Sequence, residues 1–372
     1  MAETIQRKLN DSPAARWTAL LLIASTMFFG YMFVDLMSPL QSMIEAQRGW
    51  TPDVFGMYGS SEFILNVFGF LILAGIILDK MGVRFTAVLS GAVMLVGATI
   101  NWYALTDSFL VSGLHTWFTN HLNYIPGFDE LGISPFYEGM PASAKFSAVG
   151  FMIFGCGVEM AGITVSRGIV KWFKGKEMAL AMGSEMALAR LGVATCMIFS
   201  PMFANLGGVV SVSRSVAFGV VLLMIALIMF IVYFFMDKKL DEQTHIEEEK
   251  DDPFQIKDLG RILTSMGFWL VALLCVLYYS AIFPFQKYAV NMLQCNLALN
   301  PPAEGSFWAS DTVTVIQYVI MIVVAAAAFA SNFSKGAVKK YSLLALAIVA
   351  LVAYCFFGYM RQSAAAIFAV FP

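Results

Sequence analysis

The sequence predicts an all-α protein that crosses a lipid bilayer many times, and three features carry that prediction. Of its 372 residues, 59% are hydrophobic and 13% are charged, whereas a soluble domain has roughly a quarter charged residues. The mean hydropathy is +0.75. The apolar residues form continuous runs of the length that a helix needs to cross the hydrocarbon core, about 20 residues. They do not alternate with polar residues, as the strands of a membrane barrel would.

These apolar runs predict nine membrane-spanning helices. Their ranges are 17–40, 53–78, 85–105, 146–169, 178–204, 212–236, 266–290, 312–331 and 341–360. Residues 364–372 resemble the beginning of a further span. Most Lys and Arg residues fall in segments on the same side as the N-terminus, and the opposite segments hold only Arg48, Lys145, Arg214 and Arg361. Because positive loops stay inside, we expect residues 1–16 to be cytoplasmic.

Two long connections divide the chain. Residues 106–145 are predicted to form a small structured external cap, since they contain several aromatic residues, prolines and glycines. Residues 237–261 carry runs of charge and are predicted to be a solvated cytoplasmic linker. Six spans in residues 17–236 precede this linker, and residues 262–372 follow it. We therefore expect two pseudo-symmetric helical bundles with a site between them near the midplane.

The composition also excludes several classes of protein. A net charge of −2 and a pI near 6.0 argue against a nucleic-acid-binding surface. There is no G-x-x-x-x-G-K-[ST] motif and hence no predicted ATP site. The five cysteines and three histidines show no metal-ligand spacing, and no nucleophile–base pair is evident. We therefore expect no enzymatic activity, metal or cofactor, and the expected partners are the bilayer and a small-molecule substrate.

The turn between the second and third spans contains the most specific short motif, Gly75-Ile-Ile-Leu-Asp79-Lys80-Met-Gly82-Val-Arg84. Gly82 permits a sharp turn between antiparallel helices, and Asp79 can accept from a helix N-terminus or pair with a base. Such a cluster can lock the cytoplasmic side and release it. The five numbered residues of the motif are therefore predicted to form a conformational gate. A plain positive-inside turn would also contain Lys and Arg.

Two opposite charges lie inside predicted spans. Counting about 1.5 Å per residue from the cytoplasmic ends places Glu159 roughly 15 Å deep and Arg190 roughly 18 Å deep. Because a charge at that depth costs at least about 2.5–3.5 kcal/mol, each is expected to face a cavity or a partner. One interpretation is a structural ion pair between two helices. The other is a site for a zwitterion, in which Arg190 binds a carboxylate through two parallel hydrogen bonds and Glu159 binds an ammonium group.

Other polar residues at membrane depth extend the candidate site. Tyr278 and Tyr279 precede Pro284, which is expected to break the helix and free backbone carbonyls beside a cavity. With Lys287 they are predicted to contact substrate. Asp35 and Glu62 are candidate proton acceptors of a coupled transporter, and a hydrated vestibule at the outer surface would explain them equally well.

The motif at residues 75–84 matches the G-x-x-x-D-[RK]-x-G-x-R signature of the major facilitator superfamily. Residues 157–168, 170–192 and 275–285 also resemble the branch of major facilitator superfamily domain-containing protein 1, which includes a lysosomal dipeptide uniporter. The resemblance runs over residues 17–290, outside the predicted cap. It implies transport of dipeptides by alternating access. It also implies that Glu159 binds the amino end of the peptide and Arg190 its carboxylate.

The chain departs from this branch in three respects. No dileucine sorting signal or external sequon is evident, so we expect a cell (inner) membrane rather than a lysosome, and no accessory subunit is implied. The superfamily fold has twelve spans, whereas nine are predicted here, so the C-terminal bundle is expected to be incomplete. Residues 306–362 lack the second acidic turn of the family. They are either an inserted hairpin or divergent eighth and ninth spans.

Three functional hypotheses follow. The leading one is a membrane transporter for dipeptides or amino-acid-like zwitterions. A second is an organic-anion transporter, in which Arg190 binds the anion and Glu159 only orients it. The third is a membrane sensor or scaffold without transport, in which the 106–145 cap provides the ligand or partner surface.

Overall fold

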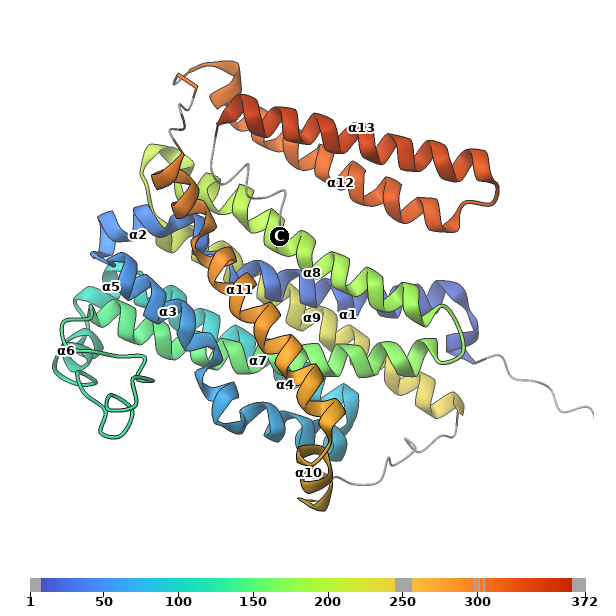
Figure 1. Cartoon of the computed structure of the whole chain (residues 1–372), viewed down its shortest axis with the longest axis horizontal. Coiled ribbons are helices and arrows are strands. Elements are labelled where there is room, and N and C mark those ends of the chain that lie inside the picture. Colours follow the sequence, from blue (N-terminus) through green and yellow to red (C-terminus); the bar gives the residue numbers. More distant parts are fainter. Residues whose placement is uncertain (1–7, 245–255, 298, 300–301, 304, 363–372) are drawn as a thin grey trace, which may run out of the picture.

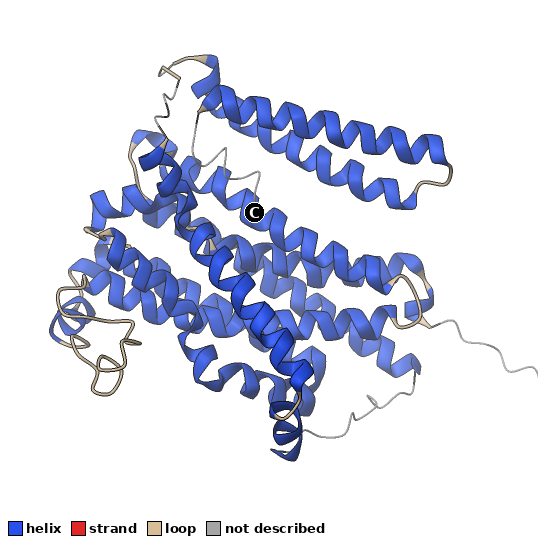
Figure 2. Cartoon of the chain, in the orientation of Figure 1, coloured by secondary structure: helices blue, strands red, loops and turns tan. Residues whose placement is uncertain are grey.

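The structure is a computed structural model of the chain, and it describes residues 8–244, 256–297, 299, 302–303 and 305–362. Figure 2 shows that the regular elements within these residues are all helices. The predicted all-α architecture is therefore confirmed. Residues 245–255 of the predicted linker and the predicted further span at 364–372 lie outside the described residues.

The longer helices are α1 (Pro13–Val34), α3 (Pro52–Leu65), α4 (Leu71–Ala104), α7 (Ala142–Phe173), α8 (Met178–Ala204), α9 (Val212–Thr244), α11 (Met266–Asn296), α12 (Asp311–Phe333) and α13 (Ala337–Arg361). The shorter ones are α2 (Gln41–Arg48), α5 (Asp107–Leu110), α6 (Gly113–Asn120) and α10 (Ile256–Leu263). In the described part of the chain, eight helical stretches are long and apolar enough to cross a membrane. The prediction of a multi-pass membrane protein agrees with this.

One of these eight stretches, Pro52–Ala104, contains two of the predicted spans. Its 53 residues would extend about 80 Å as a straight helix, far more than a bilayer core requires. Gly82 interrupts it with φ 77° and ψ 169°, a conformation that glycine adopts without steric cost. The sharp turn predicted at Gly82 is therefore present, and the spans 53–78 and 85–105 lie on either side of it.

A second break in this stretch was not predicted. Residues Asn66–Phe70, between α3 and α4, form a π-helical segment in which Gly69 has φ 98°. The predicted span 53–78 is therefore two helical pieces instead of one. Asn66 and Gly69 mark this place in the sequence, but they stand in an apolar run long enough for one span.

The predicted linker must be corrected at its beginning. The helix α9 continues to Thr244, so residues 237–244 are helical and do not form a solvated connection. The side chain of Asp237 is fully buried. This extension is stabilised because Asp237 and Asp241, one helical turn apart, both bind Lys171 of α7.

The residues before the predicted linker form the first half of the molecule. Its core depends on close contact between α4 and α7. A Cβ atom on Gly97 would lie 2.4 Å from the backbone nitrogen of Phe154, and one on Gly157 would lie 2.6 Å from that of Met94. Both distances are too short for any side chain, so glycine is required at these positions. Such small-residue contacts are how helices pack tightly in a membrane, where apolar burial against lipid gives little driving force.

Figure 1 shows the arrangement of the remaining helices. The helix α11 crosses the bundle of the first half obliquely, and α12 and α13 form a long antiparallel pair. Pro284 lies inside α11, and the helix continues through it without a break. The predicted break at Pro284 is therefore wrong. A membrane helix tolerates the one lost backbone hydrogen bond, since its neighbours compensate.

The segment predicted as a cap contains the two short helices α5 and α6. Phe109, Phe118 and Ala142 form a small buried cluster there, separate from the main core. The ammonium group of Lys145 is also enclosed, and it donates to the carbonyls of Phe118 and His121. These contacts fix the segment to the beginning of α7.

Candidate functional site

A cavity of about 630 Å³ lies among α1, α3, α7, α8 and α11. Its walls are formed by Tyr31 from α1, by Phe55, Gly56, Gly59, Ser60 and Phe63 from α3, by Glu159 from α7, by Met186, Ala189 and Arg190 from α8, and by Tyr279, Ser280, Phe283, Pro284, Lys287 and Tyr288 from α11. The lining residues of α3 recur at a spacing that places them on one face of the helix. The cavity therefore lies between helices of the first half and the first long helix that follows the linker.

Glu159 and Arg190 both line this cavity and are both half-buried. Within the described residues neither side chain has a hydrogen-bond or ion-pair partner, and the two do not pair with each other within 4.0 Å. The guanidinium of Arg190 lies 6.0 Å from the centre of the Tyr31 ring. The cavity thus has one unpaired anion and one unpaired cation in its wall, and the structural ion pair considered above is not formed.

The remaining predicted substrate contacts differ in position. Tyr279 and Lys287 line the cavity, whereas Tyr278 does not and is 55% exposed. Tyr278 is therefore not brought to the site. The reason is helical geometry, because Tyr279, Phe283 and Lys287 share one face of α11 at four-residue spacing and Tyr278 lies about 100° away from it.

The ammonium group of Lys287 binds three groups of the first half. It donates to the carbonyl of Val34, 2.7 Å away, and lies 3.2 Å from Asp35 Oδ1 and 3.5 Å from Glu62 Oε2. Val34 is the last residue of α1, so the cation binds a carbonyl at the negative end of the helix dipole. We refer to Asp35, Glu62 and Lys287 as the buried triad.

Sequence reasoning did not predict the pairing in the buried triad. Asp35 and Glu62 are 3% and 2% exposed, so the hydrated vestibule considered above for them is wrong. Lys287 was predicted to contact substrate, yet its ammonium group binds the two carboxylates. Nothing in the local sequence indicates this contact, because Lys287 is 225 residues from Glu62 along the chain.

The predicted gate involves other helices than the buried triad, namely α4, α7 and α9. Asp79 pairs with Arg167 of α7, and Arg84 lies 3.2 Å from Asp241 of α9. Lys80 is exposed, and a Cβ on Gly75 would meet no atom within 4 Å. The structure therefore gives specific partners to Asp79 and Arg84, whereas Gly75 and Lys80 are given no role by packing.

Two acidic residues of α9 complete this cluster and were missed by the sequence analysis. Asp237 accepts from Lys171 Nζ at 2.7 Å and from the indole nitrogen of Trp172 at 2.8 Å. Lys171 also lies 2.8 Å from Asp241. The one-turn spacing of Asp237 and Asp241 at the end of an apolar helix is the sequence signal for this contact, whereas the run of charge in which they stand favours a linker. We refer to Asp79, Arg84, Arg167, Lys171, Asp237 and Asp241 as the motif-end network.

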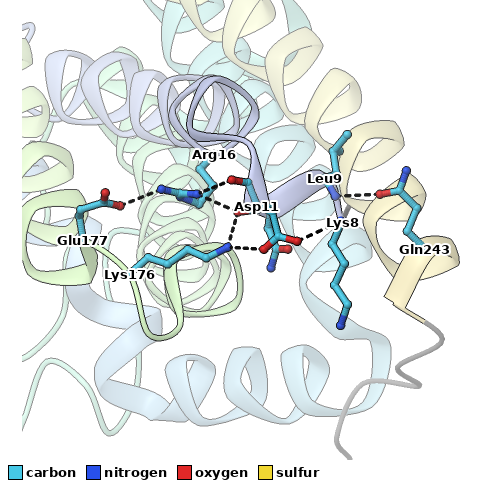
Figure 3. A network of polar contacts seen from close by, with 8 residues as sticks. Lys8, Leu9, Asp11, Arg16, Lys176, Glu177 and Gln243 are labelled. Atoms are coloured by element: carbon cyan, nitrogen blue, oxygen red, sulfur yellow. Dashed lines mark hydrogen bonds and ion pairs between the residues drawn. The ribbon is translucent and has the colours of Figure 1, made fainter. Parts of the chain in front are cut away.

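Next to this network, the N-terminal segment is bound to the loop between α7 and α8 (Figure 3). Arg16 Nη2 lies 3.0 Å from Glu177 Oε2, and Lys176 Nζ lies 3.0 Å from Asp11 Oδ1. The backbone nitrogen of Leu9 also donates to the side chain of Gln243 in α9, at 2.9 Å. The hydrogen bond from Lys176 is the main reason that the pKa of Asp11 lies below its usual value.

No group of three His, Cys, Asp or Glu side chains in the described residues is arranged to hold a metal ion. The chemistry of the cavity is therefore that of two separated charges, one amine engaged by carboxylates, and an aromatic wall.

Comparison with known proteins gives the family of the chain. Residues 20–372 match the family model of the Major Facilitator Superfamily. The lysosomal dipeptide transporter MFSD1 of Bos taurus is 29% identical over 145 residues, and that of Gallus gallus is 30% identical over 145 residues. These alignments cover 37% of this chain and only 31% and 32% of the two relatives.

A crystal structure of tetrameric PepTSo2 aligns with 93% of this chain and 72% of that chain, with a TM-score of 0.41 and 14% sequence identity. The family model covers nearly all of the sequence, and it agrees with the helical, multi-pass architecture described above. The chain therefore belongs to the Major Facilitator Superfamily, a family of membrane transporters and not of enzymes.

Proposed function

We propose that the chain moves dipeptides or amino-acid-like zwitterions across a membrane by alternating access. The observation that carries this proposal is the pair of opposite charges, Glu159 and Arg190, in the wall of one cavity, with no ion-pair or hydrogen-bond partner in the described residues. A half-buried charge at membrane depth without a counter-ion is costly, so it is retained where a ligand supplies the counter-ion. A guanidinium suits a carboxylate and a carboxylate suits an ammonium group, which are the two ends of a peptide.

The size of the cavity supports a small ligand. Sites for small molecules usually measure about 300–1,000 Å³, and this cavity measures about 630 Å³. The relatives named as dipeptide transporters add further support over the 145 aligned residues, which are about a third of their length. The cations Arg190 and Lys287 both line the cavity, but the two carboxylates of the buried triad already bind Lys287. This arrangement favours a zwitterion over an organic anion.

The two charge clusters suggest how access could alternate. In this proposal, the buried triad holds α11 against α1 and α3 at the outer end. The predicted gate, formed by Gly75, Asp79, Lys80, Gly82 and Arg84, acts at the cytoplasmic end. This orientation places the N-terminus in the cytoplasm, and we propose the cell (inner) membrane as the location.

Proton coupling through Asp35 and Glu62 is part of the same proposal. The triad holds two carboxylates and one ammonium group on side chains of which each residue is at most 9% exposed. Because like charges at close range cannot both be balanced by one cation, one carboxylate is the natural acceptor of a proton. Binding of that proton would release Lys287 from one of its two anionic partners.

The experiment that tests the function is a thermal-stability titration of the detergent-purified chain with dipeptides, single amino acids and dicarboxylates. A ligand that binds only the folded state stabilises it by about 2.7 kcal/mol at a hundredfold excess over Kd. We expect stabilisation by dipeptides. Glu159→Gln and Arg190→Lys should each weaken it by about 10- to 100-fold in Kd, because each removes a charge-assisted hydrogen bond.

Glu185→Gln is the matched control, because Glu185 is a buried carboxylate of α8 that does not line the cavity. It should leave the dipeptide affinity unchanged. Stabilisation by dicarboxylates and not by dipeptides would select the organic-anion alternative. Uptake into liposomes at two pH values then tests coupling, since a pH dependence that persists in both Asp35→Asn and Glu62→Gln contradicts a role for these residues.

A further inference from the structure

Part of the wall of the cavity is aromatic, and it is built by two helices, α3 and α11. Phe63 of α3 lies 5.3 Å from Phe283 of α11 between ring centres, and Phe283 stacks on Tyr279 at 5.1 Å. Closer to the beginning of α3, Phe55 lies 6.4 Å from Tyr288. Two aromatic bridges therefore join α3 and α11 at two levels of the cavity.

A slot without large side chains lies between these bridges. Phe55 and Phe63 are eight residues apart, which corresponds to about 12 Å along the helix. On the same face of α3, the residues between them are Gly56, Gly59 and Ser60. The Ser60 hydroxyl donates to the carbonyl of Met57 at 2.9 Å, so it is already engaged. The aromatic rings of the two bridges thus bound the slot at its two ends along α3, and the glycines of α3 form one of its sides.

The two glycines of the slot differ in what packing requires. A Cβ on Gly56 would lie 2.2 Å from the hydroxyl oxygen of Tyr288, so the approach of α11 explains this glycine. A Cβ on Gly59 would meet no atom within 4 Å, and its backbone is helical. Glycine in a helix interior is less stable than alanine, and packing gives no compensation at Gly59. Its effect is to leave space open in the wall of the cavity.

We propose that this slot is the subsite for an apolar side chain of the substrate, of the size of leucine or phenylalanine, and that Gly59 sets its size. This inference rests on the proposed function, since Glu159 and Arg190 would hold the two ends of the peptide. Lys287 is the one charged residue that α3 and α11 contribute to the cavity lining, and carboxylates bind it. A charged side chain in the slot would therefore find no free counter-ion on these two helices. Aromatic rings offer apolar contact area to both aliphatic and aromatic groups.

The test measures the apparent Kd of the purified chain for glycylglycine, glycylleucine and leucylglycine by thermal-stability titration. The two leucyl isomers show which end of the peptide supplies the side chain. In the wild type, at least one leucyl peptide should bind about tenfold more tightly than glycylglycine, as expected for burial of one apolar side chain. Gly59→Leu should fill the slot and remove this advantage, so that the leucyl peptides bind no more tightly than glycylglycine. Gly59→Ala should give an intermediate result.

Gly183→Leu is the matched control. Gly183 lies inside α8, is exposed, does not line the cavity, and would also have no atom near its Cβ. This variant should retain the preference for leucyl peptides. The melting temperature without ligand identifies any variant that fails to fold, and Gly59→Ala then still measures the size effect.

Two results would overturn the subsite while leaving the proposed function intact. In the first, Gly59→Leu retains the full preference for leucyl peptides. In the second, it weakens glycylglycine as much as the leucyl peptides. If no dipeptide stabilises the wild type, the proposed function fails and the subsite fails with it.

Discussion

The two charge clusters of the molecule join different sets of helices, and they are built differently. The buried triad joins α11 to α1 and α3, and Lys287, Asp35 and Glu62 are 9%, 3% and 2% exposed. The motif-end network joins α4, α7 and α9, which all precede the linker. Most of its side chains remain partly in water, and those of Asp79 and Arg167 are 40% and 34% exposed.

This difference separates two uses of ion pairs. In the motif-end network, water screens the partly exposed pairs, so each contributes little and can be broken at small cost. In the buried triad, the charges have lost their hydration and depend on one another. The three charges of the buried triad, which join α11 to the first half, are therefore expected to separate together. The ion pairs of the motif-end network, within the first half, can break one at a time.

The largest expected effect is that of Lys287→Met. This change leaves two carboxylates buried without a cation, and breaking a buried pair in this way costs about 3–5 kcal/mol. The free energy of unfolding, measured by denaturation of the detergent-purified chain, should fall by that amount. If Lys287→Met were no more destabilising than the loss of a partly exposed pair, the energetic difference between the two charge clusters would be refuted.

A triple variant is the control for this prediction. In Asp35→Asn/Glu62→Gln/Lys287→Met all three charges are removed, so no unpaired charge remains buried. Replacement of a complete buried ion cluster is often close to neutral. The triple variant should therefore be more stable than Lys287→Met alone, and the opposite order would contradict the account of the triad as mutually dependent charges.

The fold could be predicted from the sequence wherever length and hydropathy decide the structure. Runs of about 20 apolar residues placed the spans, and Gly82 placed the turn. The prediction failed at element ends that depend on contacts between helices. Residues 237–244 carry charge, but they are helical because two of their carboxylates meet Lys171 of another helix. Pro284 does not end α11 because one missing backbone hydrogen bond is tolerated there.

The candidate site could be predicted only in part, for a related reason. The depths of Glu159 and Arg190 follow from counting residues along helices, and both line one cavity. Counting residues also shows which side chains share one face of a helix. This count would have shown that Tyr278 and Tyr279 lie on different faces of α11. The partners of Lys287 could not be predicted, because they belong to helices more than 200 residues away along the chain.

The next effect in size is expected for Asp237→Asn in the motif-end network. Asp237 is as buried as the triad and accepts from Lys171 and Trp172. Its loss should cost about 1–3 kcal/mol, the range for removing one partner of a buried hydrogen bond. Lys171 keeps a second carboxylate, Asp241, so no bare charge remains, and the loss should be smaller than for Lys287→Met.

Denaturation of both variants under the same conditions checks this order, with Glu242→Gln as the exposed control on the same helix. If Asp237→Asn and Lys287→Met cost the same, burial alone determines the effect, and the distinction between contacts within and between the halves has no energetic basis.

The smallest effect is expected where the N-terminal segment binds the loop between α7 and α8. The pKa of Asp11 is lowered mainly by the hydrogen bond from Lys176, and that of Glu177 by its own backbone N–H and by Arg16. A carboxyl whose pKa is lower in the folded state stabilises that state above its ordinary pKa, near 4. This contribution is lost as the pH falls through that value towards the folded pKa.

At neutral pH, Glu177→Gln should cost only about 0.2–1 kcal/mol, because Glu177 is half-exposed and the buried Arg16 keeps its hydrogen bonds to the carbonyls of Asn10 and Asp11. The melting temperature of Asp11→Asn/Glu177→Gln should therefore fall less than that of the wild type between pH 6 and pH 3.5. Glu138→Gln, in an exposed part of the cap, should follow the wild type. If the double variant loses as much as the wild type, these two pairs do not hold the N-terminal segment.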